Sequence, residues 1–273
     1  MIPLSAGTLR KADCMKTMIQ SPEKAVLPGV TVDNVDRAGA LRFTFSRRKA
    51  GKQTLVVTPN AEIAFRASRD TAFSALLSAA DLVLPDGQGV VLASRLLGTP
   101  LKAKVAGIDY GESLLHLCAL HGLSVFLYGG KPGVAEAAAE NMSERFPGLK
   151  VAGTADGYHP LSVTPDADVL FVCLGSPKQE EWAAENRASL PCSVIACLGG
   201  SIDVWAGKAD RAPLIMRKAG LEWLFRLIKE PTRLPRMLSI PGYLLCTMKT
   251  RTERNRADLR RSGKNEPNRY KNG

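Results

Sequence analysis

The chain alternates two kinds of hydrophobic pattern. Short runs of apolar, often β-branched residues are followed by longer segments in which apolar residues recur every three or four positions. The short runs are typical of strands, and the longer segments are typical of helices. The short runs contain almost no polar positions, as expected of parallel strands buried on both faces. We expect strands at residues 54–58, 82–85, 124–130, 168–175 and 192–200, and helices at about 61–80, 89–97, 111–120, 133–145 and 179–190.

This strict alternation of strands and helices predicts the fold class. Such a chain forms an α/β protein whose mainly parallel, doubly wound sheet is covered by helices on both faces, as in Rossmann-like folds. With 273 residues and 45% hydrophobic content, the chain can fill one large core. We expect a poorly patterned and partly disordered segment at 1–26, an α/β core at 27–207, a helical appendage at 208–248, and a basic, disordered tail at 249–273.

Polar residues cluster directly after each predicted strand. In a parallel α/β sheet, ligands bind beyond the carboxyl ends of the strands, so these clusters share the ligand side of the sheet. The sequence therefore predicts a binding site along one rim. The clusters are TPN at 58–60, PDG at 85–87, YGG at 128–130, GSPKQE at 175–180 and GGSID at 199–203.

Asp86 is the single carboxylate in the stretch LVLPDGQGVV at residues 82–91. Two interpretations are open. Asp-Gly is a common turn between a strand and a helix, so Asp86 can be explained by turn chemistry. Its predicted place on the ligand side of the sheet instead suits a catalytic base.

Three further motifs give weaker signals. YGGKPG at 128–133 resembles a glycine-rich phosphate loop and suits a nucleotide-sugar diphosphate, but it lacks the spacing of dinucleotide and ATP loops. DAD at 166–168 looks like a metal-binding DxD motif, yet it precedes its strand and falls on the opposite rim. The histidines His116, His121 and His159 form no ligand cluster in the sequence. We therefore predict no bound metal and no cofactor.

The net charge of +11 is confined to the C-terminal part of the chain. Residues 208–273 contain 17 Lys and Arg against 6 Asp and Glu, whereas residues 1–207 contain 20 of each sign. Such a run is usually a solvated face or a disordered tail. Residues 212–248, however, mix basic residues with Trp223, Phe225 and several leucines, and this combination favours an anionic membrane surface. No recognition-helix or base-stacking pattern is present, so we do not expect a nucleic-acid partner.

Cysteine usage and the apolar runs indicate the compartment. The six cysteines show no CxxC spacing and several lie inside apolar runs, which predicts buried free thiols in a reducing cytoplasm. The first twenty residues hold no apolar stretch of signal-peptide length, and no run approaches the roughly 18 apolar residues of a membrane span. We therefore expect a cytoplasmic protein without a membrane-spanning helix. Homo-oligomerisation is left open.

Several longer motifs resemble one known family. Between about Leu27 and about Leu245, and in the family's order, the chain resembles the WecG/TagA/CpsF family of bacterial glycosyltransferases. This resemblance implies an inverting, metal-independent transferase at the cytoplasmic face of the membrane. Such an enzyme passes a sugar from a UDP-sugar to a polyprenyl-diphosphate-linked sugar during assembly of cell-surface polysaccharides. The stretches concerned are TPNAEI, LPDGQGVV, VAGIDY, VFLYGGKPGVAE, FPGLKVAGTADGY, LGSPKQEEW and the segment that begins GSIDVWAGKADRAPLIMRKAG.

The resemblance also assigns roles to individual residues. Inverting transfer needs a base for the acceptor hydroxyl and a group that stabilises the departing diphosphate, and Asp86 matches the base. Lys104 stands where the family commonly has an arginine, so it keeps the charge but loses bidentate phosphate geometry. The other matches are Thr58 and Asn60 near the acceptor and catalytic centre, Gln179 and Asp203 in the donor pocket, and Arg226, Arg233 and Arg236 in an appendage expected to close over the site and contact phosphates.

Two other function classes stay open at this point. A non-catalytic, membrane-associated scaffold could share the fold and the basic tail, but it would not need Asp86 and Gln179 on the ligand rim. A nucleic-acid-binding protein would explain only the charge. Within the transferase class, the donor can carry N-acetylmannosamine, its uronic acid or a glucose-type sugar.

Overall fold

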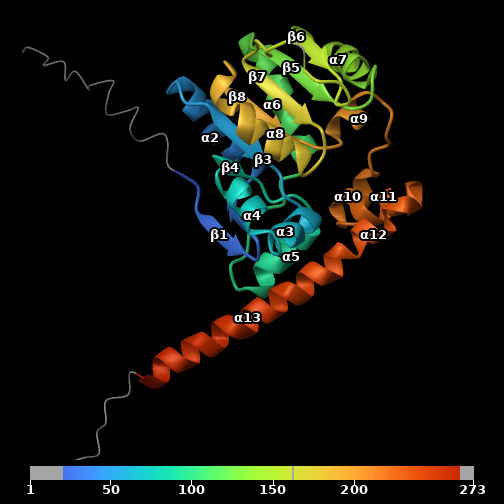
Figure 1. Cartoon of the computed structure of the whole chain (residues 1–273). Coiled ribbons are helices and arrows are strands. Elements are labelled where there is room, and N and C mark those ends of the chain that lie inside the picture. The colour runs from blue at the N-terminus through green and yellow to red at the C-terminus, as the bar shows by residue number, and fades with distance from the viewer. Residues whose placement is uncertain (1–20, 162, 265–273) are drawn as a thin grey trace, which may run out of the picture.

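A six-stranded, fully parallel sheet forms the centre of the protein (Figure 1). It is seen in a computed structural model that describes residues 21–161 and 163–264, the side chains of residues 233, 235, 236 and 258–264 excepted. The strand order is β4-β3-β8-β7-β5-β6. The predicted doubly wound α/β fold is confirmed. The strands are β3 (Thr54–Val57), β4 (Leu82–Val83), β5 (Ser124–Gly129), β6 (Lys150–Ala155), β7 (Val169–Cys173) and β8 (Val194–Cys197).

Helices cover both faces of the sheet because each buried strand sends alternate side chains to opposite sides. On β5, Val125 and Leu127 join one hydrophobic cluster, whereas Phe126 and Tyr128 join the other. The first cluster is covered by α2 (Arg37–Lys49), α6 (Gly107–His121), α7 (Val134–Arg145) and α9 (Ser201–Trp205). The second is covered by α3 (Ala61–Ala67), α4 (Thr71–Ser78), α5 (Gln88–Leu96) and α8 (Lys178–Asn186), which the short η1 (Arg187–Ser189) follows.

The chain before the sheet is more ordered than its sequence pattern indicates. β1 (Lys24–Leu27) and β2 (Val30–Asp33) form an antiparallel hairpin, so residues 24–26, at the end of the segment expected to be poorly patterned, belong to an ordered strand. The carboxylate of Asp33 accepts a 2.7 Å hydrogen bond from the amide of Val83 and so ties the hairpin to β4. Two strands of four residues each are too short to show a periodic pattern. Residues 1–20 of the predicted segment lie outside the described residues.

The C-terminal part wraps back over the core. The short helices α10 (Leu214–Lys218), α11 (Glu222–Lys229), η2 (Pro231–Arg233) and α12 (Leu234–Met237) lead into the long helix α13 (Ser239–Lys264), which runs along α3 and α5 (Figure 1). The predicted boundary at residue 248 falls inside α13, because no Pro or Gly interrupts residues 243–262. Tyr243 is fully buried and its hydroxyl donates to the carbonyl of Pro28 at 3.3 Å, so the start of α13 belongs to the core.

The described cysteines are free thiols. Cys118, Cys173, Cys192 and Cys197 are buried, and Cys246 is half-buried. Burial raises the pKa of the first four above the usual thiol value, which keeps them protonated at neutral pH. The sixth cysteine, at position 14, lies outside the described residues.

Candidate active site

A cleft of about 670 Å³ opens at the carboxyl edge of the sheet. Its floor is built by residues that follow β3, β4, β7 and β8, which are adjacent in the order β4-β3-β8-β7. Helix α11 and the start of α13 complete its wall. Four of the five predicted polar clusters contribute to this one cleft. The YGG cluster after β5 is not among its lining residues in the described part of the chain.

Asp86 lies on the floor of the cleft, in the turn after β4. Its amide donates to the carbonyl of Pro59 at 3.2 Å, and its carboxylate accepts a 3.4 Å hydrogen bond from the amide of Gly107 at the start of α6. The N-cap of α5 is Gly87, whose φ of +81° suits glycine, and no side chain caps that helix. The turn is therefore made by Gly87, and the carboxylate of Asp86 is directed to the cleft and to α6.

The environment of Asp86 makes it a weaker acid than an ordinary aspartic acid. Burial raises the pKa of Asp86 from its ordinary value of 3.8 to about 6, because the carboxylate loses surrounding water. Arg226, the amide of Gly107 and Lys104 act in the opposite direction, whereas the negative charge of Glu222 adds to the rise. A carboxylate with a pKa nearer neutrality is a better proton acceptor for a hydroxyl group.

Thr58 and Asn60 follow β3 and line the same floor. The hydroxyl of Thr58 donates to the carbonyl of Cys197 at 3.0 Å and joins the ends of β3 and β8. The carbonyl oxygen of Asn60 accepts from the amide of Ile63 at 3.0 Å and caps α3, so its NH₂ group is what it can offer to a ligand. A Cβ atom at Gly107 would lie 3.1 Å from the Thr58 hydroxyl oxygen, so α6 begins in close contact with this floor.

Gln179 supports the other side of the floor. It is only 2% exposed, and its side-chain oxygen accepts from the amide of Gly199 at 2.8 Å. Its NH₂ group donates to the carboxylate of Glu180 at 2.8 Å. Because both ends of the amide are held, Gln179 fixes the loop after β8 at the cleft. Glu180 is 1% exposed, and burial raises its pKa.

Lys104 and Arg226 connect the cleft to the C-terminal helices. Lys104 forms a short ion pair with Glu222 of α11, and the two side chains are only 18% and 21% exposed. This pair holds α11 against the core. Arg226, one turn further along α11, lines the cleft together with Glu222 and Trp223. The structure thus brings Asp86, Lys104 and Arg226 into one charged group.

The three other predicted site residues are Asp203, Arg233 and Arg236, and only the first has a described side chain. Asp203 is not among the described residues that line the cleft, although Ser201 at the start of α9 is. Positions two apart in a helix point in directions about 200° apart, which explains why only Ser201 lines the cleft. The side chains of Arg233 and Arg236 lie outside the described part of the structure, so their predicted contacts with phosphate stay predictions.

The sequence analysis missed several residues of the cleft. Arg66, Leu92 and Arg95 lie on helices that begin at cleft loops, and each is three or four positions from another residue of the same helix that lines the cleft. This spacing was a usable signal, because such positions share one helix face. Glu222 and Trp223 gave no such signal, since only the folding of the C-terminal helices brings them to the site. The missed residues are Arg66, Gln88, Leu92, Arg95, Glu222 and Trp223.

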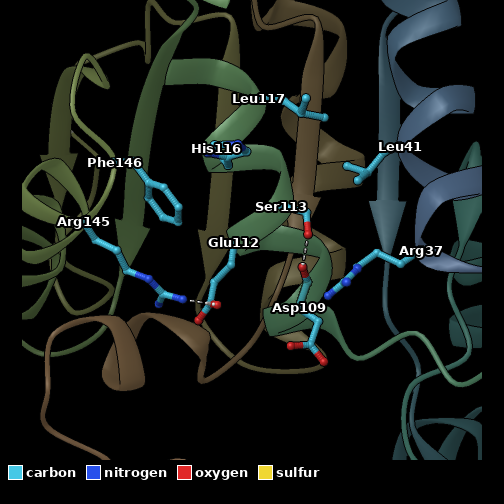
Figure 2. Close-up of a pocket in the computed structure, with 9 residues that line it drawn as sticks. All are labelled: Arg37, Leu41, Asp109, Glu112, Ser113, His116, Leu117, Arg145 and Phe146. Carbon is cyan, nitrogen blue, oxygen red and sulfur yellow. Dashed lines mark hydrogen bonds and ion pairs between the residues drawn. The ribbon is translucent and has the colours of Figure 1, made fainter. Parts of the chain in front are cut away.

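A second hollow, of about 370 Å³, lies on a different face of α6 and is already occupied by paired charges. Figure 2 shows Arg145 reaching Glu112, at 2.8 Å, with Asp109 one turn away on α6. Arg211, from the segment between α9 and α10, forms ion pairs with both carboxylates. We interpret this hollow as the anchor of the segment that leads to the C-terminal helices.

Comparison with known families decides the class of protein. The sequence model of the glycosyl transferase WecG/TagA/CpsF family matches residues 25–257. The chain belongs to the WecG/TagA/CpsF family. It is therefore a glycosyltransferase, as the motifs predicted, and the interpretation as a non-catalytic scaffold is set aside.

Three relatives of this WecG/TagA/CpsF protein share the name N-acetylglucosaminyldiphosphoundecaprenol N-acetyl-beta-D-mannosaminyltransferase. The protein of Bacillus spizizenii is 40% identical over 207 residues, which are 72% of this chain and 80% of the relative. That of Bacillus subtilis is 39% identical over 71% of this chain and 79% of the relative. That of Staphylococcus aureus strain MW2 is 32% identical over 81% of this chain and 91% of the relative.

Neither a metal-binding cluster nor a membrane-spanning helix is found among the described residues. Within residues 21–161 and 163–264, no group of three or more His, Cys, Asp or Glu side chains is arranged to hold a metal ion. DAD at 166–168 lies before β7, and Asp168 instead binds Ser124 and Arg48 at the opposite edge of the sheet. Over the same residues, none of the helices combines the length and apolar character needed to cross a bilayer.

Proposed function

We propose that this protein is an inverting transferase that moves an N-acetylmannosamine-type sugar from a UDP-sugar to a polyprenyl-diphosphate-linked sugar. The names of the relatives support this sugar over its uronic acid or a glucose-type sugar. The observation that carries the proposal is the desolvated carboxylate of Asp86 on the cleft floor, beside Lys104 and Arg226. A base and neighbouring cations are the two elements that transfer from a sugar diphosphate requires.

In the proposed reaction, the acceptor hydroxyl attacks the anomeric carbon of the donor sugar while its proton passes to Asp86. The new bond joins the hydroxyl oxygen to the anomeric carbon. The bond from that carbon to the diphosphate oxygen breaks, and its electron pair leaves with UDP. Attack from the side opposite the departing group inverts the anomeric centre. Thr58, Asn60 and Gln179 line the same cleft as Asp86, and in this proposal the first two contact the acceptor and Gln179 belongs to the donor pocket.

The cations of α11 and the core suit the departing diphosphate. Arg226 lines the cleft, and the ion pair between Lys104 and Glu222 holds Lys104 against α11. Positive charge placed where negative charge develops stabilises the transition state, and its effect is larger in a desolvated cleft. In this proposal Arg233 and Arg236 add further charge from η2 and α12, as the family resemblance implies.

The C-terminal helices also suit an anionic membrane surface at the cytoplasmic face. Ile215 is 82% exposed, and Ile228 and Leu238 are 65% and 64% exposed, on a segment that also carries most of the excess positive charge. Exposed apolar residues next to cations are the features of an interfacial helix, and each surface Lys or Arg contributes on the order of 1 kcal/mol at an anionic leaflet. We propose that this surface brings the enzyme to its lipid-linked acceptor.

The direct test is a screen of UDP-sugars against N-acetylglucosaminyl diphosphate carried on an isoprenoid, with UDP release as the readout. We expect UDP-N-acetylmannosamine to give the highest kcat/KM, and the Asp86→Asn variant to release UDP at least about 100-fold more slowly. Release of UDP from a different sugar would revise the donor. No release from any UDP-sugar would contradict the proposed reaction. Binding to anionic vesicles but not to duplex DNA at moderate salt tests the membrane surface.

A further inference from the structure

One wall of the cleft is apolar, in contrast to its polar floor. It consists of two residues of α5, one each of α11 and α12, and two of α13. Leu92 of this wall is 44% exposed and Trp223 is 40% exposed, so two large apolar side chains face the open cleft. We call the following set the apolar wall: Val91, Leu92, Trp223, Met237, Ile240 and Leu244.

The sheet order gives this wall a defined place relative to the reacting groups. Gln179 follows β7, whereas Asp86 follows the edge strand β4. Helix α5 begins at Gln88, two positions after Asp86, and α13 packs on α5. The apolar wall therefore lies beyond Asp86 when the cleft is followed from the donor side. An acceptor whose hydroxyl is at Asp86 would extend toward this wall.

We propose that the apolar wall binds the isoprenoid units next to the diphosphate of the lipid-linked acceptor. The inference rests on the proposed function and names a subsite for the acceptor's chain. Leucine, isoleucine and tryptophan side chains can contact the isoprenoid and remove its apolar surface from water, which is favourable. The name of the Bacillus spizizenii relative gives its acceptor as an undecaprenol derivative, and undecaprenol is an isoprenoid.

Charged residues of the same cleft match the part of the acceptor between sugar and chain. Arg95 lies one turn after Leu92 on α5, and Arg66 lies on α3, and both line the cleft. With Arg226 they add three cations to the cleft that contains both Asp86 and the apolar wall. The polar floor, these cations and the apolar wall are contacts that suit the sugar, the diphosphate and the isoprenoid of one acceptor, and all of them lie in the same cleft.

The test compares two acceptors in detergent solution, where no bilayer is present. Both carry N-acetylglucosamine on a diphosphate, one esterified to a geranylgeranyl chain and the other to an ethyl group. We expect the wild type to have the lower KM for the isoprenoid acceptor. Leu92→Gln should raise that KM about fivefold, the order expected from losing some tens of Å² of apolar contact. The KM for the ethyl acceptor and both kcat values should change little.

Three further variants complete the design. Leu245→Gln is the matched control, because Leu245 is 67% exposed on α13 but is not among the described cleft residues. It should leave the ratio of the two KM values unchanged. Leu92→Met should keep the preference for the isoprenoid acceptor. Trp223→Gln repeats the test from α11 if Leu92→Gln does not fold.

The outcomes separate the inference from the proposed function. Two results would overturn the subsite: equal KM values for the two acceptors in the wild type, or a ratio of the two KM values that is unchanged in both Leu92→Gln and Trp223→Gln. In either case, transfer to the ethyl acceptor would still support the proposed reaction. A loss of preference in Leu245→Gln as large as in Leu92→Gln would assign the effect to general apolar exposure and would also overturn it. No transfer to either acceptor by the wild type would overturn the proposed function itself.

Discussion

Asp86→Asn should make the protein more stable at neutral pH while it removes activity. The folded environment raises the pKa of Asp86 from 3.8 to about 6, mainly through desolvation. The folded protein thus binds this proton more tightly than the unfolded chain does, and stability falls as the pH rises from 3.8 through about 6. A rise of about two pKa units corresponds to about 3 kcal/mol of lost stability above pH 7. Asparagine carries no charge and avoids this loss.

Chemical denaturation at several pH values measures the effect. Between pH 5 and pH 7.5, the free energy of unfolding of Asp86→Asn should exceed that of the wild type by an amount that grows from about 1.6 to about 3 kcal/mol. Glu253→Gln is the control, because the side chain of Glu253 is exposed on α13 and its loss should give no comparable pH-dependent gain. Protonation of Asp86 also predicts that kcat/KM of the wild type rises with pH through about 6.

Turnover of the same variant completes the test. We expect kcat to fall by about 100-fold or more while the Kd for UDP stays close to the wild-type value, because the proton acceptor is lost and the fold is kept. A variant that matches the wild type in turnover would remove Asp86 from the chemistry. A stability difference that is absent, or that does not change with pH, would show that the carboxylate is not desolvated in the folded protein.

Four other perturbations follow from the cleft and the C-terminal helices. Glu222→Gln removes a negative charge that raises the pKa of Asp86 and also frees Lys104, so the acid limb of the kcat/KM profile should move to lower pH. Lys104→Met removes a positive charge near Asp86 and should move that limb to higher pH. A limb that stays in place in both variants would contradict the role of the ion pair. Addition of EDTA should leave transfer nearly unchanged, and complete loss restored by manganese or magnesium would be the opposite result. Truncation after Thr250 should weaken binding to anionic vesicles in a salt-dependent way but keep transfer to an acceptor in detergent. Full vesicle binding by the shortened chain would argue against an electrostatic contribution of residues 251–273.

The truncation is placed at Thr250 because the core does not end where the charge pattern changes. The charge pattern predicts a boundary after residue 207, where the basic segment begins. Tyr243 is fully buried, however, and Gly242 packs so closely on Phe65 of α3 that an added Cβ would lie 2.8 Å from its ring. Removal of α13 would uncover the outer side of α3 and α5. A charge pattern reports the solvent-facing side of a helix, and it does not show what the other side covers.

Periodicity and strand ends by themselves determined most of the fold and the floor of the site. Buried parallel strands produce long apolar runs, and their carboxyl ends must share one edge, so Asp86, Thr58, Asn60 and Gln179 could be assigned to one cleft without coordinates. The same reasoning placed Asp168 at the opposite edge. It missed the β1–β2 hairpin, because four-residue strands carry too few positions to establish a period.

The tertiary structure decided the contacts that depend on segments far apart in the chain. Lys104 and Glu222 are 118 positions apart, and nothing local in either segment predicts that they pair or that α11 brings opposite charges to Asp86. The apolar wall likewise joins α5 to α11, α12 and α13. Local patterns arise from the repeat of one element, strand or helix. Desolvation, pairing of charges and the lining of a cleft arise from which elements pack together, and that is determined only by the folded chain.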